Sequence, residues 1–208
     1  MTEDLQALHQ EIRACKACAL HQGCTQAVPG HGHPQARIML VGEAPGFHED
    51  RQGIPFVGNA GQLLNQLLDH IGLKREDVYV TNIVKHRPPG NRDPLPDEVE
   101  ACASFLDREI SIIRPAVILL LGRYAMQRLL PGTEGISRSH GRLIERPGRA
   151  YVPLYHPAAA LHNGFLLETL KQDFLKVKGY LDEIERRAPV AATASDPVTA
   201  PEEQLSLF

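Results

Sequence analysis

The sequence predicts an α/β protein whose mostly parallel sheet is covered by helices on both faces. Three observations lead to this fold class. Four apolar runs, each too short for a helix, end at glycine or polar residues as strands do. Segments with apolar residues at helical spacing separate these runs. The run AVILLL at 116–121 is apolar at every position, as expected for a strand buried on both faces.

The first half of the chain contains two predicted helices and two predicted strands. Residues 4–14 carry leucine and isoleucine at helical spacing. The first strand, 37–42, is an apolar run ended by glycine. The next helix, 61–71, has leucines on one face and Gly72 beyond its end. The second strand, 77–84, reads DVYVTNIV and is rich in β-branched residues.

The second half continues the alternation. A helix at 97–113 has one apolar face and precedes the buried strand 116–121. Residues 122–130 are predicted to be helical. The fourth strand covers 150–155, and an amphipathic helix at 165–184 closes the folded part of the chain.

Composition limits the function classes. The 208 residues are 43% hydrophobic and 23% charged, and such a chain buries one substantial core. A formal net charge of -3 gives no bulk signature of nucleic-acid binding, although 22 basic residues can still cluster on one face. No apolar segment approaches the roughly 18 to 20 residues of a membrane span, and the N-terminus is too acidic for a secretory signal. We therefore expect a soluble, cytoplasmic protein that acts as a monomer.

The composition changes near residue 188. We expect one folded domain over 1–187, and a disordered linker over 188–203, which has no apolar periodicity. Residues 204–208 read QLSLF and place three large apolar side chains at the tip of this tail. Such an end is suited to docking on a partner, or else folds back onto the domain.

Polar residues follow all four predicted strands. The strands lead into Glu43, Asn82, Arg123 and His156, respectively. In parallel sheets ligands bind beyond the carboxyl ends of the strands, so these side chains are expected at one edge. The glycine- and proline-rich stretch 42–61 joins the first strand to a helix and is expected to shape a pocket there.

The four cysteines suggest metal ligands or ordinary core residues, because four are few for a disulfide framework in a chain of this size. Cys15 and Cys18 are three residues apart at a helix end, where both thiolates can face one centre. A redox pair fits less well, since that motif follows a strand and opens a helix. Two unrelated buried thiols are the remaining reading. Cys24 and Cys102 lie further along the chain.

Three longer motifs identify a resemblance. Residues 42–61 contain GEAPG-x-x-ED-x-x-G-x-P-FVG-x-AG, and VTN-x-VK-x-RPPGNR and HPAAAL follow in order. Together they resemble the family 4 uracil-DNA glycosylases, the iron-sulfur type, over about residues 8–183. The resemblance implies a three-layer α/β/α sandwich with a central four-stranded parallel sheet, and removal of uracil from DNA in base excision repair.

The resemblance also implies roles for individual residues. Glu43 and the backbone around Ala44 would line the uracil pocket, and Phe56 would stack on the flipped base. Asn82 would read the uracil edge through its amide, and His156 would stabilise negative charge near uracil O2.

Further implied roles concern the water and the DNA. Glu43 or Glu49 would position the attacking water, and the sequence does not choose between them. Ala158 to Leu161 would enter the duplex where the base leaves. Candidate phosphate contacts are Gly58, Gly61, Arg87, Arg138 and Arg142.

The implied cofactor is a 4Fe-4S cluster held by Cys15, Cys18, His86 and Cys102. Family members usually carry cysteine at position 86, so the imidazole departs from the pattern, although imidazole ligates some iron-sulfur centres. Cys24 is the rival fourth ligand. Zinc fits three cysteines and one histidine equally well on spacing alone.

The histidine at position 86 also resembles UdgX, the branch that cross-links to uracil-DNA. That branch has an additional KRRIH loop that this chain lacks, so turnover is expected rather than covalent trapping. A non-catalytic uracil-DNA-binding module is one alternative. A nucleotide-binding α/β enzyme is another, although no Walker or dinucleotide fingerprint is present. The QLSLF end, Gln204 to Phe208, resembles peptides that bind the bacterial sliding clamp, and a nucleoid-associated location would follow.

Overall fold

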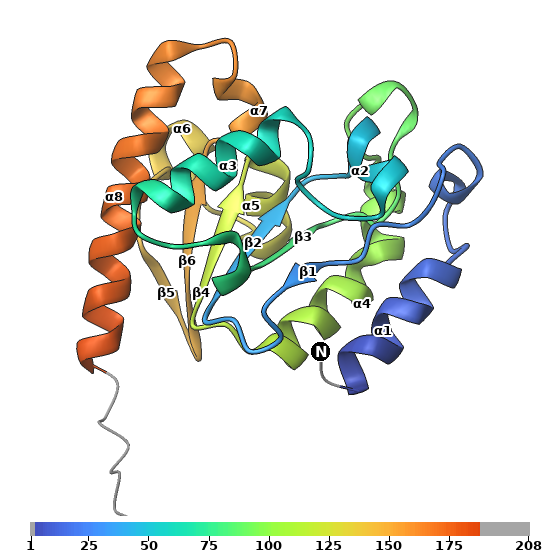
Figure 1. The fold of residues 1–208 in the computed structure, drawn as a ribbon, viewed down its shortest axis with the longest axis horizontal. Helices are drawn as coiled ribbons and strands as arrows, with labels where there is room; N and C mark the ends of the chain where they lie inside the picture. Colours follow the sequence, from blue (N-terminus) through green and yellow to red (C-terminus); the bar gives the residue numbers. More distant parts are fainter. Residues whose placement is uncertain (1–2, 188–208) are drawn as a thin grey trace, which may run out of the picture.

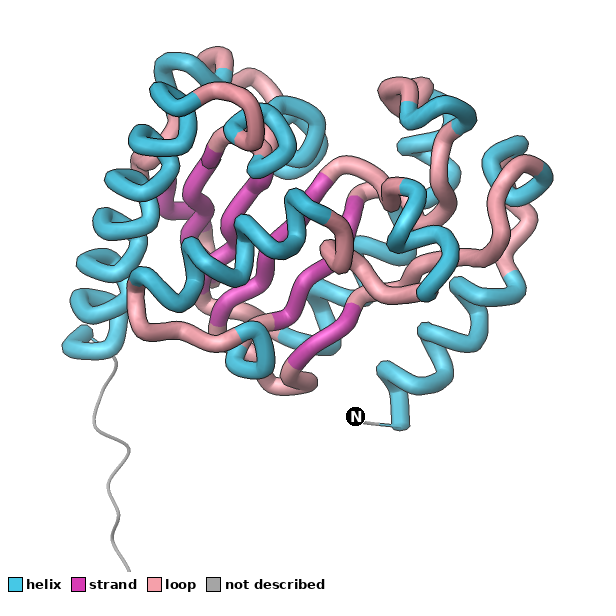
Figure 2. Tube along the Cα trace, turned by 45° about the horizontal axis from the view of Figure 1, so that its top comes forward, coloured by secondary structure: helices cyan, strands magenta, loops and turns pink. Residues whose placement is uncertain are grey.

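A twisted sheet forms the middle layer of the computed structural model, which describes residues 3–187 (Figures 1 and 2). Within this range the sheet has six strands in the order β1-β3-β2-β4-β6-β5. The strands are β1 (His31–Gly32), β2 (Ile38–Gly42), β3 (Tyr79–Asn82), β4 (Val117–Leu121), β5 (Ile144–Arg146) and β6 (Arg149–Leu154). The predicted linker 188–203 and clamp-binding end 204–208 lie outside the described residues.

The predicted parallel sheet is confirmed in its four central strands. β3, β2, β4 and β6 are parallel neighbours, with Leu40 of β2 opposite Val80 of β3 and Leu119 of β4. The sheet also has an antiparallel strand at each edge, β1 beside β3 and β5 beside β6. These two strands are only two and three residues long, too short for a hydrophobic pattern to predict them.

Helices cover both faces of the sheet, as the α/β/α prediction requires (Figure 1). They are α1 (Glu3–Ala14), α2 (Phe47–Gln52), α3 (Asn59–His70), α4 (Pro96–Ile113), α5 (Arg123–Leu129), α6 (Ile136–Ser139), α7 (Pro157–Ala160) and α8 (Gly164–Arg187). The alternation of side chains along β2 divides the core in two. Ile38 and Leu40 pack in the cluster that contains the buried faces of α3 and α8. Met39 and Val41 pack in the cluster that contains those of α4 and α5.

The stretch 42–61 contains a short helix that the sequence pattern did not predict. α2 spans only six residues, Phe47–Gln52, and is fixed by its ends instead of by an apolar face. Its Glu49 carboxylate accepts a hydrogen bond from the N–H of Gly46 at 3.1 Å. It ends at Gly53, whose φ of 70° is in the left-handed region that favours glycine.

The carboxyl ends of the four parallel strands meet at one edge, where α2 and α7 also lie (Figure 1). This edge is the place where side chains from four separate parts of the chain can face one ligand. In the described part of the chain, no helix is both long and apolar enough to cross a lipid bilayer.

Candidate functional site

A cavity of about 280 Å³ opens at the carboxyl edge of the sheet. Several residues that the sequence analysis assigned to a site line this cavity: Glu43, Ala44, Glu49, Phe56, Asn82, His156 and Ala158. The remaining lining residues are Pro45, Gly46, Ala60, Pro88, Asn91 and Arg92. Carboxylate, amide and imidazole groups from the ends of β2, β3 and β6 thus converge on one space with the ring of Phe56, which lies between α2 and α3.

Phe56 is held in an unusual backbone conformation beside the cavity. Its φ of 56° lies in the left-handed region, which is uncommon for a bulky residue. Two glycines allow the fit: a Cβ on Gly42 would lie 2.6 Å from the Phe56 ring, and one on Gly61 would lie 1.9 Å from the Phe56 carbonyl oxygen. The ring centroid is 5.7 Å from that of His156. The aromatic wall of the cavity is therefore fixed before any ligand arrives.

Asn82, the last residue of β3, presents a polar group that has no partner within residues 3–187. The side chain is 1% exposed, and its Oδ1 is buried without a hydrogen-bond partner among the described residues. Burying a polar atom without a partner costs about 1–3 kcal/mol. Such an atom in a cavity wall is suited to accept a hydrogen bond from a ligand N–H.

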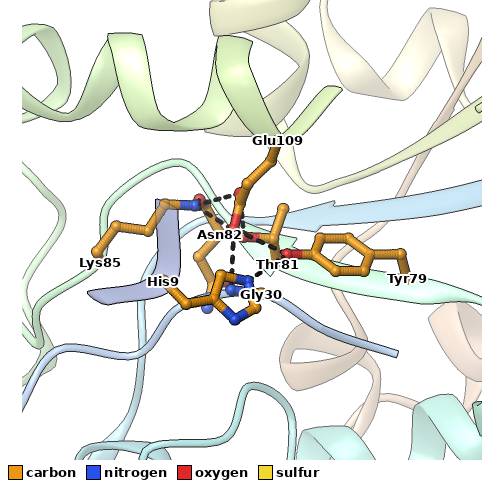
Figure 3. Close-up of polar contacts among 7 residues, drawn as sticks. All are labelled: His9, Gly30, Tyr79, Thr81, Asn82, Lys85 and Glu109. Carbon is orange, nitrogen blue, oxygen red and sulfur yellow. Dashed lines mark hydrogen bonds and ion pairs between the residues drawn. The ribbon is translucent and has the colours of Figure 1, made fainter. Parts of the chain in front are cut away.

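A buried ion pair lies behind Asn82 (Figure 3). Lys85 and Glu109 have fully buried side chains, and Lys85 Nζ lies 2.7 Å from Glu109 Oε2. The same ammonium group donates to Thr81 Oγ1 at 2.7 Å and to the backbone carbonyl of Asn82 at 2.8 Å. All three ammonium protons therefore have acceptors, and one of them anchors the backbone of Asn82.

Other groups complete this network. Glu109 Oε1 accepts from the N–H of Gly30 at 2.9 Å and from the Tyr79 hydroxyl at 3.1 Å. The Tyr79 oxygen also lies 2.9 Å from Nε2 of His9 on α1. Burial raises the pKa of the Tyr79 hydroxyl and lowers the pKa of His9. The network thus links α1, α4 and β3. The neutral side chains of Tyr79 and His9 extend it outward from the single ion pair.

Glu43 is the half-buried carboxyl group of the cavity. Burial, followed by the nearby negative charge of Asp93, raises its pKa to about 7, and Arg123 opposes this shift. Asp93 accepts hydrogen bonds from Arg123 Nη2 at 2.7 Å and from the Tyr124 hydroxyl. At neutral pH Glu43 is therefore poised between its ionised and protonated forms, as suits an acid–base group.

Glu49 lines the cavity but is occupied by the backbone. Its Oε1 accepts from the N–H groups of Val57 and Gly58 at 2.9 and 2.8 Å, and its Oε2 accepts from the N–H of Gly46. The carboxylate holds the turn around Phe56 to the start of α2. It has less capacity to hold a water molecule than Glu43 has.

His156 begins α7 and faces the cavity as a neutral ring. Its Nδ1 accepts a hydrogen bond from the N–H of Ala158, so the ring proton is carried by Nε2. Burial lowers its pKa to about 4, and the charge of Glu49 only partly opposes this. The histidine is thus a neutral N–H donor at physiological pH.

The predicted DNA-contacting residues differ in their exposure and in their present partners. Leu161, at the end of α7, is 38% exposed, as an inserting side chain must be. Arg87 donates through Nε to Asn91, a cavity residue, at 2.7 Å. Arg138 is exposed on α6, and Arg142 pairs with Glu134 at 3.7 Å.

Gly58 and Gly61, both predicted phosphate contacts, lie close to other parts of the site. The N–H of Gly58 donates to Glu49. Gly61 is buried under the backbone of Phe56. The N–H of Gly58 is thus occupied in the absence of DNA, and the phosphate contacts of both glycines stay predictions.

The residues predicted to hold the cluster come from three parts of the fold: Cys15 and Cys18 follow α1, His86 follows β3, and Cys102 lies on α4. Cys18 and Cys102 share one apolar cluster, and the pKa of Cys102 is raised to about 11, mainly by burial, with smaller effects of Cys18 and Cys15. His86 is 4% exposed, and its Nδ1 is buried without a hydrogen-bond partner among the described residues. A buried ring nitrogen that lacks a partner in the described part of the chain is free to ligate a metal.

Two further observations bear on this centre. Cys24 Sγ lies 3.6 Å from the carbonyl oxygen of His21, which accepts from it, so this thiol already has a backbone partner. Across residues 3–187, no group of three or more His, Cys, Asp or Glu residues forms a site for a metal ion.

Sequence reasoning missed several residues of the site. Asn91 and Arg92 line the cavity, and Arg92 forms a bidentate pair with Glu98 at 2.8 and 2.6 Å. Both belong to the RPPGNR motif, which was a signal that the region matters. Lys85 belongs to the same longer motif, whereas its partner Glu109, 24 positions further along the chain, had no such signal.

Comparisons with known proteins agree with this geometry. The family model described as the uracil DNA glycosylase superfamily matches residues 29–179. A type-4 uracil-DNA glycosylase of Archaeoglobus fulgidus is 47% identical, covering 84% of this chain and 92% of the relative. One from Sulfurisphaera tokodaii is 44% identical, covering 85% and 84%, respectively. One from Thermotoga maritima is 40% identical, covering 86% and 95%.

Proposed function

The chain belongs to the uracil DNA glycosylase superfamily, and we propose that it removes uracil from DNA in the cavity at the carboxyl edge of the sheet. Its activity is that of a uracil-DNA glycosylase, which hydrolyses the bond between uracil and deoxyribose and leaves an abasic site for base excision repair. The observation that carries the assignment of the cavity is the unpartnered Asn82 Oδ1 in its wall.

Base recognition combines stacking and hydrogen bonding. The flipped uracil stacks on Phe56, whose position is fixed by Gly42 and Gly61. Asn82 Oδ1 accepts from N3–H of uracil, and the amide N–H₂ donates to a ring carbonyl oxygen. Cytosine has no proton on N3 and an amino group in place of O4, so both hydrogen bonds would fail.

The leaving group is stabilised by His156. As the bond between C1′ and N1 breaks, the sugar gains oxocarbenium character and uracil leaves as an anion. A neutral imidazole with its proton on Nε2 donates a hydrogen bond to this anion at O2. The donor is preorganised, because Nδ1 is already held by the N–H of Ala158.

The water is oriented by Glu43 and not by Glu49. Ionised Glu43 stabilises the positive charge on the sugar and accepts a proton from water. The water oxygen bonds to C1′ in the same step. A pKa near 7 suits this acceptor. Glu49, occupied by three backbone N–H groups, positions Phe56 and α2.

DNA contacts surround the cavity. Ala158 to Leu161 enter the space that the base leaves, and Arg87 contacts the backbone phosphates. Arg138 and Arg142, which do not line the cavity, contact other phosphates, with Arg142 exchanging its pairing with Glu134 for the DNA.

Cys15, Cys18, His86 and Cys102 hold a 4Fe-4S cluster. Two observations support this donor set: the buried Nδ1 of His86 lacks a partner in the described part of the chain, and Cys18 and Cys15 contribute to the raised pKa of Cys102. The cluster, when bound, supplies a structural cross-link between α1 and α4 and no chemistry to the cavity.

The end of the chain binds the sliding clamp through Gln204 to Phe208. Its sequence supports this, and these residues lie outside the described part of the structure. The enzyme would then work as a tethered monomer at the nucleoid. Deletion of 204–208 should abolish clamp binding while leaving uracil release from short oligonucleotides unchanged.

One assay tests the function. Purified protein is incubated with a uracil-containing oligonucleotide, treated with alkali and examined for strand scission, with a thymine oligonucleotide as control. Scission of the uracil strand alone is expected. Binding without scission would indicate a non-catalytic module, and a denaturant-resistant adduct would indicate UdgX-type trapping. The variant Asn82→Ala should lose scission while retaining its fold.

A further inference from the structure

An exposed aromatic residue lies at the rim of the cavity between two arginines. Phe47, the first residue of α2, is 48% exposed. The Arg51 guanidinium lies 5.7 Å from its ring centroid, and that of Arg87 lies 5.2 Å from it. We call these three residues the Phe47 patch. None of the reactions described above uses Phe47 or Arg51.

The outward face of α2 carries no negative charge. The helix contains two acidic residues, but Glu49 is turned to backbone N–H groups, and Asp50 is 4% exposed and accepts from the N–H of Thr25 at 2.8 Å. The exposed side chains are Phe47, His48, Arg51 and Gln52. In a chain with a net charge of -3, this is a local surface suited to an anionic, aromatic partner.

The Phe47 patch adjoins the cavity. Gly46, directly before Phe47, and Pro88, directly after Arg87, both line it. Arg87 is also fixed to the cavity residue Asn91 through its Nε. A DNA strand whose uracil occupies the cavity must therefore pass close to this surface.

We propose that the Phe47 patch is a second nucleotide subsite, in which the base next to the uracil in the same strand stacks on Phe47 and its phosphate pairs with Arg51. The subsite rests on the proposed function of the cavity. Every base has a π-face, so the stacking carries no sequence preference. The phosphate supplies the negative charge that the exposed face of α2 lacks.

Stacking of a base on Phe47 is stronger than the present cation–π contacts of its ring with Arg51 and Arg87. An exposed cation–π contact is worth about a factor of 2 to 5 in an equilibrium constant. Stacking of a base on an aromatic side chain is worth about a factor of 5 to 150. A base thus displaces a guanidinium from the ring, and the released guanidinium pairs with the phosphate. In duplex DNA the neighbouring base is already stacked and paired, so the subsite acts mainly on single strands.

The test uses labelled single-stranded oligonucleotides with a tetrahydrofuran abasic analogue at the uracil position, which the enzyme cannot cleave. A second probe carries the same analogue at both flanking nucleotides as well. The full-length protein should bind the second probe about tenfold more weakly by fluorescence anisotropy. Phe47→Ala should bind the first probe about tenfold more weakly and should not distinguish the two probes. Leu175→Ala, which removes an exposed apolar side chain on α8, should behave as the unmodified protein.

A salt titration tests the arginine. Arg51→Gln should reduce the slope of log Kd against log salt concentration by about 0.7, the value for one contact to single-stranded DNA. The proposal fails if the unmodified protein binds both probes equally, or if Phe47→Ala still distinguishes them. Uracil release by the unmodified protein is measured in parallel. Its absence would overturn the proposed function, whereas uracil release with no probe discrimination would overturn only the subsite.

Discussion

His156 accepts a hydrogen bond at Nδ1 from the backbone N–H of Ala158, two residues along the chain, at 3.1 Å. This contact places the ring proton on Nε2, which makes a neutral histidine a donor toward the leaving uracil. His156→Ala should therefore lower kcat by about 10²- to 10³-fold, as loss of one preorganised donor does, with a smaller change in KM. Single-turnover uracil release measures this. His70→Ala removes an exposed histidine at the end of α3 and should have no effect. An equal loss in both variants would contradict the role of His156.

The pH profile should report Glu43. With its pKa near 7, the ionised form is lost as pH falls below 7, so kcat/KM should decline on the acidic side from about that value. Titration of His156 does not contribute to the decline of kcat/KM near pH 7, because its pKa is about 4. Asp93→Asn removes a charge that raises the pKa of Glu43 and frees Arg123, which lowers it, so the decline should move to lower pH. Arg123→Gln should move it to higher pH. Shifts in the same direction for both variants would refute the assignment.

Glu43 should also reduce stability at alkaline pH. Its pKa is about 7 in the folded protein and near 4.5 in an unfolded chain. The folded state therefore binds more protons between these values, and stability falls as pH rises through this window. Glutamine cannot ionise, so Glu43→Gln should raise Tm at pH 8 and leave Tm nearly unchanged at pH 4. Thermal unfolding followed by circular dichroism measures both. An equal shift at the two pH values would show that packing, not ionisation, is responsible.

The central sheet and much of the site could be predicted from local patterns. Apolar runs such as that at 116–121 predict buried strands, and the carboxyl-edge rule brought Glu43, Asn82 and His156 to one cavity. The edge strands β1 and β5 could not be predicted, because two or three residues carry no periodicity.

Other features depend on contacts between distant parts of the chain. The left-handed φ of Phe56 requires close approach by Gly42 and Gly61. The raised pKa of Glu43 depends on its burial and then on Asp93, which lies in a different loop. A single sequence specifies these contacts only through the complete fold, so residue types alone do not indicate them.

The cluster ligands can be separated by substitution. His86 has a buried nitrogen without a partner in the part of the chain that the structure describes, whereas the Cys24 thiol has a backbone carbonyl partner. His86→Ala should therefore lose iron, sulfide and visible absorption, while Cys24→Ala retains them. His86→Cys should retain them as well, since a thiolate replaces the imidazole. Metal analysis of the purified proteins measures this. Loss of colour in Cys24→Ala alone would reverse the assignment, and zinc in place of iron would refute the cluster.

The buried pair of Lys85 and Glu109 offers a test of how Asn82 is held. Removing one partner leaves an uncompensated charge, so Lys85→Met should lower the free energy of unfolding by about 3–5 kcal/mol. Lys85→Met combined with Glu109→Leu should be less destabilised than Lys85→Met alone, because no buried charge remains. Urea unfolding measures both. Arg108→Met, which breaks a solvent-exposed pair with Glu11, serves as the control and should change stability little.

Activity distinguishes anchoring of Asn82 from general stabilisation. The combined variant keeps a packed core but lacks the donor to the Asn82 carbonyl, which lies 2.8 Å from Lys85 Nζ. Its kcat/KM for uracil should therefore stay well below that of the unmodified protein even at temperatures where both are fully folded. The reason is that the amide needs its backbone held to meet the base edge. Full activity in a folded combined variant would show that the ion pair stabilises β3 without positioning the amide.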